Sequence, residues 1–427
     1  MSGGAGYRRS TPSERSDLKR IGPGTRFKRA KKYFKYATLT VAALLALAIV
    51  WDVASYDADA WLSDYARLKR DMAQGYANLD WMVDKRGIDL AALDRRTTDA
   101  LRNAHSNVRA FVALRGFLRG FGDPHLRMKP GERPAPMQAI AGTHAAEEID
   151  PPAGTDCAAA GYEEGDHSFR FPFAKIPGWK RMRDGDFPSG TAGDTGVLRI
   201  AQFGEDQYLS ACQAVFEPGI GRYALKLAVR ARQQAQLREA VAELRKHGVR
   251  RLLVDVSGNG GGTEWVSEVV ALMTDRELHR RGALRTAPAC DRSAVWRGTP
   301  APCPVFAGTS ADRIALQGTG EWHGPLLILA DRSTGSAAED FVAWLQQNKV
   351  ATVLGEKTAG AGCGYVDGGN PTRLDVVPVD VWMPNCARFL EDGTNEIEGI
   401  APNIALPMAD SDSDAQALAL DAALARD

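Results

Sequence analysis

The chain has 427 residues, 44% of them hydrophobic and 25% charged, so it can bury a large core, and its length favours two or three domains. Its formal net charge is +0, which argues against a basic nucleic-acid-binding protein. The charge is unevenly spread, because residues 1–35 carry eleven Lys and Arg against Glu14 and Asp17, and the remainder is mildly acidic. We therefore expect no nucleic-acid partner.

An apolar run of sixteen residues, Tyr36–Trp51, follows this basic tail. A bilayer core needs about 20 apolar residues, and the flanking aromatic residues Tyr33, Phe34 and Trp51 suit its interfaces. We expect residues 36–52 to be an uncleaved, single-pass signal anchor in a bacterial inner membrane. Residues 1–35 would then be a cytoplasmic tail and the rest would be periplasmic. A cleaved signal peptide is the alternative, although Val-Ala-Ser after Asp52 is a mediocre cleavage site.

Export would allow the six cysteines to form disulfides, because they would lie in an oxidising compartment. Cys290 and Cys303 around a Pro-rich loop are the first pair that we expect, and Cys363–Cys386 with Cys157–Cys212 would complete one of the fifteen connectivities that six cysteines allow. Free buried thiols are the alternative. No cysteine pair has the spacing of metal ligands and no histidine flanks one, so we expect no metal site.

The distribution of apolar residues and helix breakers divides the rest of the chain. Helical spacing predicts a small helical domain over residues 53–128, which closes with the breakers Gly120-Phe-Gly-Asp-Pro. Residues 129–195 predict an irregular connecting region with one candidate strand around Phe169-Arg-Phe-Pro-Phe. Buried strands alternate with helices over residues 196–408, which predicts an α/β domain with a mostly parallel sheet. Residues 409–427 predict a terminal helix.

Two junctions between a strand and a helix carry residues suited to chemistry. The first is Ser257-Gly-Asn-Gly-Gly-Gly262 after the strand Arg251–Val256. Glycines let the backbone approach a ligand, and helix N-terminal N–H groups stabilise negative charge, as in an oxyanion hole or a phosphate cradle. A phosphate-binding loop usually continues with Lys-Ser/Thr, whereas Thr263-Glu264 follows the glycines here. A simple tight turn is the structural alternative.

The second junction places Ser336 at the start of a helix, after the strand Pro325–Ala330. The small residues Ala337 and Ala338 leave room for a substrate carbonyl beside the hydroxyl, which suits a nucleophile. Ser336 is equally suited to be a helix N-cap, since Glu339 three residues later would complete a capping box. The segment has neither the G-x-S-x-G nor the S-x-x-K pattern.

Six segments in this order resemble the tail-specific (C-terminal processing) protease family and its tricorn-like relatives. They are Gly122–His125, Gly196–Phe203, Leu253–Gly262, Ser333–Glu339, Gly355–Gly362 and Glu398–Asn403. The resemblance covers about residues 61–407, with a gap over 129–190. It implies a crotonase/ClpP-like α/β core preceded by a helical region, and the activity of a serine peptidase.

The resemblance also implies the roles of individual residues. It places the nucleophile at Ser336 and the oxyanion-hole donors at the N–H groups of Gly261 and Ala337. The processing branch of the family uses a lysine base where this chain has Ala361, so that dyad is excluded. Lys357, four residues earlier, is a minor alternative.

The tricorn-like branch instead uses a histidine that matches His125, and an imidazole can take a serine proton near neutral pH. Its carboxylate matches Glu396, with Glu398 close by. That branch has a serine before the histidine as an intermediary, and Pro124 replaces it here. Glu396 could therefore reach His125 directly, or Asp123 could orient the imidazole instead.

We expect an exported serine peptidase that cleaves peptide or protein substrates through a Ser-His-carboxylate acyl-enzyme mechanism and needs no cofactor. Residues 129–190 lack the pattern of a PDZ domain, so tail specificity has no support from the sequence. Two alternatives stay open: a non-catalytic protein that binds peptides or apolar ligands on the same fold, and an exported esterase or amidase. The oligomeric state does not follow from the sequence.

Overall fold

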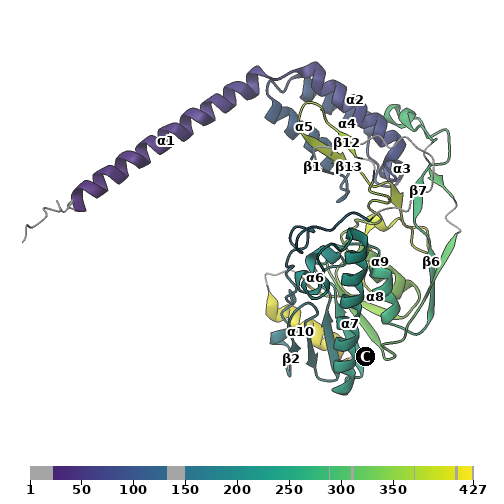
Figure 1. Cartoon of the computed structure of the whole chain (residues 1–427). Helices are drawn as coiled ribbons and strands as arrows, with labels where there is room; N and C mark the ends of the chain where they lie inside the picture. The colour runs from purple at the N-terminus through teal and green to yellow at the C-terminus, as the bar shows by residue number, and fades with distance from the viewer. Residues whose placement is uncertain are drawn as a thin grey trace, which may run out of the picture.

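The computed structural model describes residues 23–131, 150–287, 289–308, 312–369, 371–408 and 412–425. It begins with the long helix α1 (Pro23–Ala54), in which the stretch Tyr36–Ala54 is long and apolar enough to cross a membrane (Figure 1). This stretch is not buried by the rest of the described residues, apart from contacts of α5 with Asp52 near its end, and it coincides with the anchor expected at residues 36–52. Most of the expected basic tail lies outside the described residues.

Four helices follow and form the expected small helical domain: α2 (Ala58–Gly75), α3 (Leu79–Asp84), α4 (Leu90–Arg102) and α5 (Asn107–Arg119). Side chains cap three of them, since Asp57, Asp89 and Ser106 each accept a hydrogen bond from a first-turn N–H. Their inward faces bury Trp61, Leu101, Phe117 and neighbouring apolar residues.

Later parts of the chain complete this domain, which residues 53–128 do not build alone. Strands β1 (Arg127–Pro130), β13 (Val379–Trp382) and β12 (Thr372–Arg373) form a small sheet in that order, near α5 in Figure 1. Trp296 from the short helix η3 (Ser293–Arg297) and Val381 enter the same core as Phe117. Segments from residues 196–408 therefore complete the helical domain, which the contiguous domain boundaries expected from the sequence did not include.

The α/β domain contains a seven-stranded sheet with the order β15-β11-β10-β5-β4-β3-β2. Its strands are β2 (Lys180–Arg183), β3 (Ser189–Ala192), β4 (Thr195–Arg199), β5 (Arg251–Asp255), β10 (Leu326–Ala330), β11 (Ala351–Gly355) and β15 (Ile404–Ala405). The five strands from β15 to β4 pair in parallel, and β3 and β2 add antiparallel pairs at one edge. The expectation of a mostly parallel sheet is confirmed.

Alternate residues of the central strands enter two different cores. Leu252 and Val254 share a core with α6 (Leu209–Val215), α7 (Arg222–Lys246), α8 (Val266–Leu272) and α9 (Ala337–Gln347). Leu253 lies in the other core, with α10 (Ser413–Leu424). The expected terminal helix thus covers one face of the sheet.

The connecting region differs from the expectation in two ways. Strands β2 and β3, which lie within residues 129–195, join the main sheet. The candidate strand around Phe169 is wrong: the chain forms only the short helix η1 (Phe173–Lys175), because Pro172 cannot donate to a strand ladder and the aromatic rings pack on one another. Phe173 stacks on Trp179 with 5.1 Å between ring centroids. Residues 132–149 lie outside the described residues.

Two smaller β units join the domains. Strands β6 (Glu277–Arg281) and β9 (Arg313–Gln317) pair with each other, and β7 (Leu284–Thr286) lies between β8 (Phe306–Ala307) and β14 (Cys386–Ala387). The structure contains the three expected disulfides, Cys157–Cys212, Cys290–Cys303 and Cys363–Cys386. The third attaches β14 to the loop after β11.

Candidate active site

The two junctions singled out in the sequence meet in space. Strands β5 and β10 are parallel neighbours, so the loops that follow them start at the same edge of the sheet. Gly335 N–H donates to the carbonyl of Asn259 at 2.9 Å, and Thr334 Oγ1 donates to the carbonyl of Val256 at 3.0 Å. These bonds hold Ser336 against the glycine-rich loop.

Ser336 has an unusual backbone conformation, with φ 55° and ψ −117°. A non-glycine residue at positive φ is strained, and an ordinary N-cap residue has an extended backbone instead. Ser336 does start α9 with a capping box, in which its N–H donates to Glu339 Oε2 at 2.9 Å. Capping does not require the strain. Sharp strand-to-helix turns of this kind expose catalytic serines in other hydrolases.

The glycine-rich loop touches Ser336 so closely that a side chain would not fit. A Cβ atom on Gly261 would lie 2.6 Å from the Cβ of Ser336. The N–H of Gly261 donates to Asn259 Oδ1 at 2.9 Å, so in this conformation it is not available to an oxyanion. The N–H groups of Ala337, Gly260 and Gly262 have no acceptor among the described residues.

His125 lies in the turn between helix α5 and strand β1, and three hydrogen bonds fix its position. Its N–H donates to Asp123 Oδ1 at 2.9 Å, and the Tyr365 hydroxyl donates to its carbonyl. Its Nδ1 lies 3.0 Å from the carbonyl oxygen of Ala361. Because a carbonyl can only accept, Nδ1 carries the hydrogen and Nε2 keeps its lone pair.

Burial lowers the pKa of His125 below its ordinary value of 6.5, although the Asp123 carboxylate and the Ala361 carbonyl oppose the shift. Asp123 is itself buried, and burial raises the pKa of its carboxyl group while hydrogen bonds from Tyr76 and Asn78 counteract the rise. The imidazole is therefore neutral at neutral pH, as a general base must be.

Ser336, Ala337 and His125 line one cavity of about 480 Å³. Arg127 and Arg388 add positive charge to its wall, and Glu264 and Asp340 add negative charge. A cavity of this size is typical of ligand sites. The structure thus brings the expected nucleophile, base and one oxyanion donor to the same space.

Glu396 is bound to two arginines and not to the imidazole of His125. Its buried carboxylate accepts hydrogen bonds from Arg280 and from Arg388 Nε, the latter at 2.6 Å, and no hydrogen bond among the described residues joins it to His125. Arg388 Nη2 in turn donates to the carbonyl of Ser336 at 2.8 Å. Burial alone would raise the pKa of Glu396, but the two guanidinium groups lower it. Glu396 is therefore connected to the serine through Arg388 and not to the imidazole.

The other sequence candidates also lie away from the His125 ring. Glu398 accepts hydrogen bonds from Trp81 and Arg86, at 2.8 and 2.9 Å. Lys357 is exposed and does not line the cavity. Asp123 contacts the backbone of His125, so it orients the residue without touching the ring.

Glu339 has a larger structural role than the sequence suggested. Besides Ser336 N–H, its buried carboxylate accepts hydrogen bonds from Thr358 Oγ1 and from the N–H groups of Gly360, Ala361 and Gly362, at 2.7–3.0 Å. Burial raises the pKa of Glu339, and the hydrogen bonds oppose the rise. One carboxylate thus joins the serine turn to the loop that holds His125. The S-x-x-E spacing pointed to Glu339, whereas no sequence signal pointed to Arg388.

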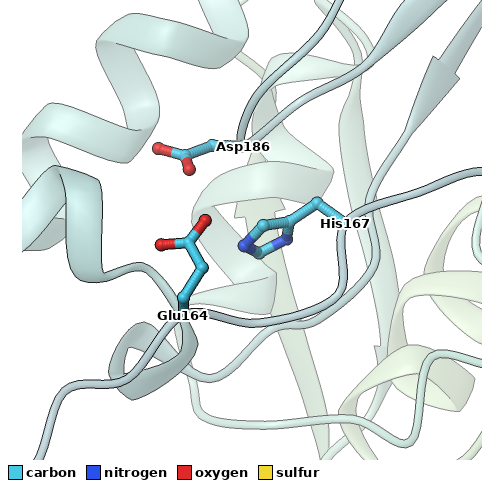
Figure 2. Close-up of side chains that lie close together, drawn as sticks. All are labelled: Glu164, His167 and Asp186. Atoms are coloured by element: carbon cyan, nitrogen blue, oxygen red, sulfur yellow. The ribbon is translucent and has the colours of Figure 1, made fainter.

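One group of potential metal ligands occurs among the described residues. Ligand atoms of Glu164, His167 and Asp186 lie within 4.8 Å of one another (Figure 2). His167 Nε2 is 3.0 Å from the carbonyl of Gln207, its Nδ1 has no partner among the described residues, and Asp186 accepts a hydrogen bond from Ser210. None of the three lines the cavity around Ser336, so the group has no part in the chemistry there.

Known proteins share the family and the fold of this chain. Residues 194–406 match the model of peptidase family S41. A putative peptidase from Parabacteroides merdae has a similar structure, with a TM-score of 0.55 and 16% identity over 85% of this chain and 95% of that one. Mature CPAF is similar as well, with a TM-score of 0.55 and 13% identity over 86% and 96% of the two chains.

No curated protein sequence matches the chain significantly. At these identities the solved structures establish the fold alone, and the family match carries the assignment. The chain is a serine peptidase of family S41, whose model matches residues 194–406.

Proposed function

We propose that this peptidase cleaves peptide bonds with Ser336 as the nucleophile and His125 as the general base. The observation that carries the proposal is the shared cavity: it contains a serine on a strained turn and a histidine whose Nδ1–H is fixed by the Ala361 carbonyl. This tautomer directs the lone pair of Nε2 to accept a proton. The strained turn exposes the hydroxyl at the start of α9.

The proposed reaction follows the acyl-enzyme route. Ser336 Oγ attacks the substrate carbonyl while His125 Nε2 takes its proton, and the imidazolium then protonates the leaving amine. Water hydrolyses the acyl-enzyme with the same base. The free N–H of Ala337 stabilises the oxyanion, and loss of one such donor typically costs about 10²–10³-fold in kcat.

The second oxyanion donor comes from the glycine-rich loop. The resemblance favoured Gly261, whose N–H is bound to Asn259 in this conformation. Gly260 and Gly262 line the cavity and have N–H groups without an acceptor among the described residues. We assign the second donor to this turn, and Gly261 provides the close approach to Ser336.

Glu396 is a positioning residue in this proposal. It holds Arg388, and Arg388 holds the carbonyls of Ser336 and Gly362. The Ala361 carbonyl takes the place at Nδ1 that a carboxylate occupies in a Ser-His-Asp triad. Asp123 supplies negative charge near the imidazole through its contact with the His125 backbone.

We also propose that the enzyme is anchored in a bacterial inner membrane with its catalytic domain in the periplasm. The apolar stretch Tyr36–Ala54 and the basic residues before it support a single span with a cytoplasmic N-terminus. Three disulfides and no free cysteine among the described residues suit an oxidising compartment.

A fluorophosphonate probe tests the nucleophile directly. The detergent-solubilised full chain is labelled between about pH 6 and 9, the range in which a histidine base is neutral. We expect mass spectrometry to find the adduct on Ser336, and Ser336→Ala to abolish it. Ser333→Ala, an exposed serine on the same turn, is the matched control and should label normally.

Labelling at no pH in this range would favour a ligand-binding protein on the peptidase fold. A peptide library and a set of simple esters then separate the remaining classes. Hydrolysis of esters without hydrolysis of any peptide would replace the peptidase by an esterase.

A further inference from the structure

Helix α5 is attached to the end of the apolar helix α1. Asn107 Nδ2 donates to the carbonyl of Asp52 at 3.2 Å and to Ser55 Oγ at 3.0 Å, and Val108 N–H donates to Asp52 Oδ1 at 3.0 Å. Trp61 Nε1 donates to Asn107 Oδ1 at 2.9 Å and fixes the same corner. Figure 1 shows α5 next to the end of α1. The first turn of α5 therefore lies where the candidate membrane span ends.

The outward face of α5 is apolar at this end. Val108 and Val112 are 63% and 61% exposed and lie one turn apart, whereas Leu114 and Phe117 face the core. A comparable pair, Tyr223 and Leu227, occurs on α7 and has no connection to α1. Scattered exposed apolar residues are normal, but this pair adjoins the end of a membrane span.

The same face of α5 is strongly basic. Arg109, Arg115 and Arg119 are exposed, and α5 contains no acidic residue. None of the three arginines has an ion-pair partner among the described residues. Arginines beside a few apolar side chains are the pattern of a helix that lies in the interface of an anionic membrane.

We propose that α5 lies on the surface of the membrane that α1 enters, with Val108 and Val112 in the interface and the arginines on the phosphates of anionic phospholipids. The proposal rests on membrane anchoring through α1. Helix α5 ends at Arg119, six residues before His125, so its contact with the bilayer fixes the height and orientation of the catalytic cavity above the membrane.

A fluorescent probe on α5 tests the contact in the full chain. All six cysteines form disulfides, so Val112→Cys is the single site for an environment-sensitive label. The chain is placed in nanodiscs of phosphatidylcholine, with or without phosphatidylglycerol. We expect a blue shift and quenching by nitroxide lipids at residue 112, greater with the anionic lipid. Tyr223→Cys on α7 is the control and should show neither.

Charge variants test the role of the arginines. Each arginine near an anionic surface strengthens membrane binding about fivefold. The double variant Arg109→Gln with Arg115→Gln should therefore weaken the docking of α5 roughly 30-fold. The probe at residue 112 should then give the same signal in anionic nanodiscs as in neutral ones. The matched pair Arg232→Gln with Arg250→Gln removes two other exposed charges and should change nothing.

The outcomes separate the proposals from one another. A probe at residue 112 that stays as polar and unquenched as the control in anionic nanodiscs would overturn the docking of α5. Failure of the chain to enter nanodiscs would overturn anchoring. Fluorophosphonate labelling of Ser336 in the same samples reports the peptidase site independently and should be unaffected by every one of these variants.

Discussion

The Nδ1 of His125 lies 3.0 Å from the carbonyl oxygen of Ala361, the position at which the sequence resemblance places the lysine base of the processing branch. The methyl side chain of Ala361 cannot act as a base, but in the proposed mechanism its backbone carbonyl orients the imidazole as the third member of a triad would. A carbonyl carries no full charge, so it stabilises an imidazolium less than a carboxylate would. Burial and the charge of Asp123 are therefore the main influences on the pKa of His125, the proposed base.

This arrangement predicts the pH dependence of activity. Burial lowers the pKa of His125 from 6.5, and only the neutral imidazole accepts the serine proton. We expect kcat/KM to fall as the pH drops through that pKa, with a midpoint below 6.5. Asp123→Asn removes a charge that raises the pKa, so the midpoint should move to lower pH. A midpoint above 6.5 in the native enzyme would contradict the buried environment of the base.

Glu339 is predicted to control the geometry of the site without touching the substrate. Glu339→Gln replaces one acceptor oxygen by an NH₂ group that faces N–H donors, so several buried hydrogen bonds are lost. The loop that carries Ala361 then moves relative to Ser336. A misplacement of about 1 Å can cost about 10²-fold in rate, and we expect a loss of that order in kcat.

Two controls accompany this substitution. Glu268→Gln changes an exposed glutamate on α8 and should retain full activity. Circular dichroism should show that Glu339→Gln still folds. Full activity of a folded Glu339→Gln enzyme would mean that the carboxylate does not position the loop.

The sequence supported much of the fold and part of the site, for reasons that the structure makes clear. Local signals were sufficient for the parallel strands and for the serine at the start of α9, because each depends on residues close together in the chain. The expected disulfide pairs were one of fifteen possible sets, and no local signal joins Cys157 to Cys212, which lie 55 residues apart. Residues near Trp296 and Val381 cross into the helical domain, and hydrophobic patterning does not show which core a segment enters. The assignment of Glu396 to the imidazole had another origin, the resemblance to the tricorn-like branch. No motif indicated that Arg388 would bind both this carboxylate and the Ser336 carbonyl.

Glu396 is predicted to stabilise the fold and to position Ser336, but to leave the pKa of His125 unchanged. Removing one partner of a buried ion pair costs about 3–5 kcal/mol, so Glu396→Gln should lower the free energy of unfolding by that order in urea titrations. Loss of the contact from Arg388 to Ser336 should also lower kcat. The acidic limb of the pH profile of kcat/KM should keep its midpoint. A shift of that midpoint would mean that Glu396 does interact with the imidazole of His125.

The Cys363–Cys386 disulfide is predicted to support catalysis beyond its effect on stability. Cys363 lines the cavity, and its neighbours Ala361, Gly364 and Tyr365 all lie against His125. Replacing both cysteines by serine frees this loop from β14, so we expect a loss of kcat together with roughly 3 kcal/mol of stability from the larger unfolded-state entropy.

The Cys290–Cys303 disulfide provides the matched control for this prediction. It also closes a short loop, and neither of its cysteines lines the cavity. Its double serine variant should lose a similar amount of stability, because the loop-closure entropy changes little with loop length. Its kcat, measured well below the unfolding temperature, should stay unchanged. Equal losses of kcat in the two variants would show that the disulfide beside His125 contributes stability alone.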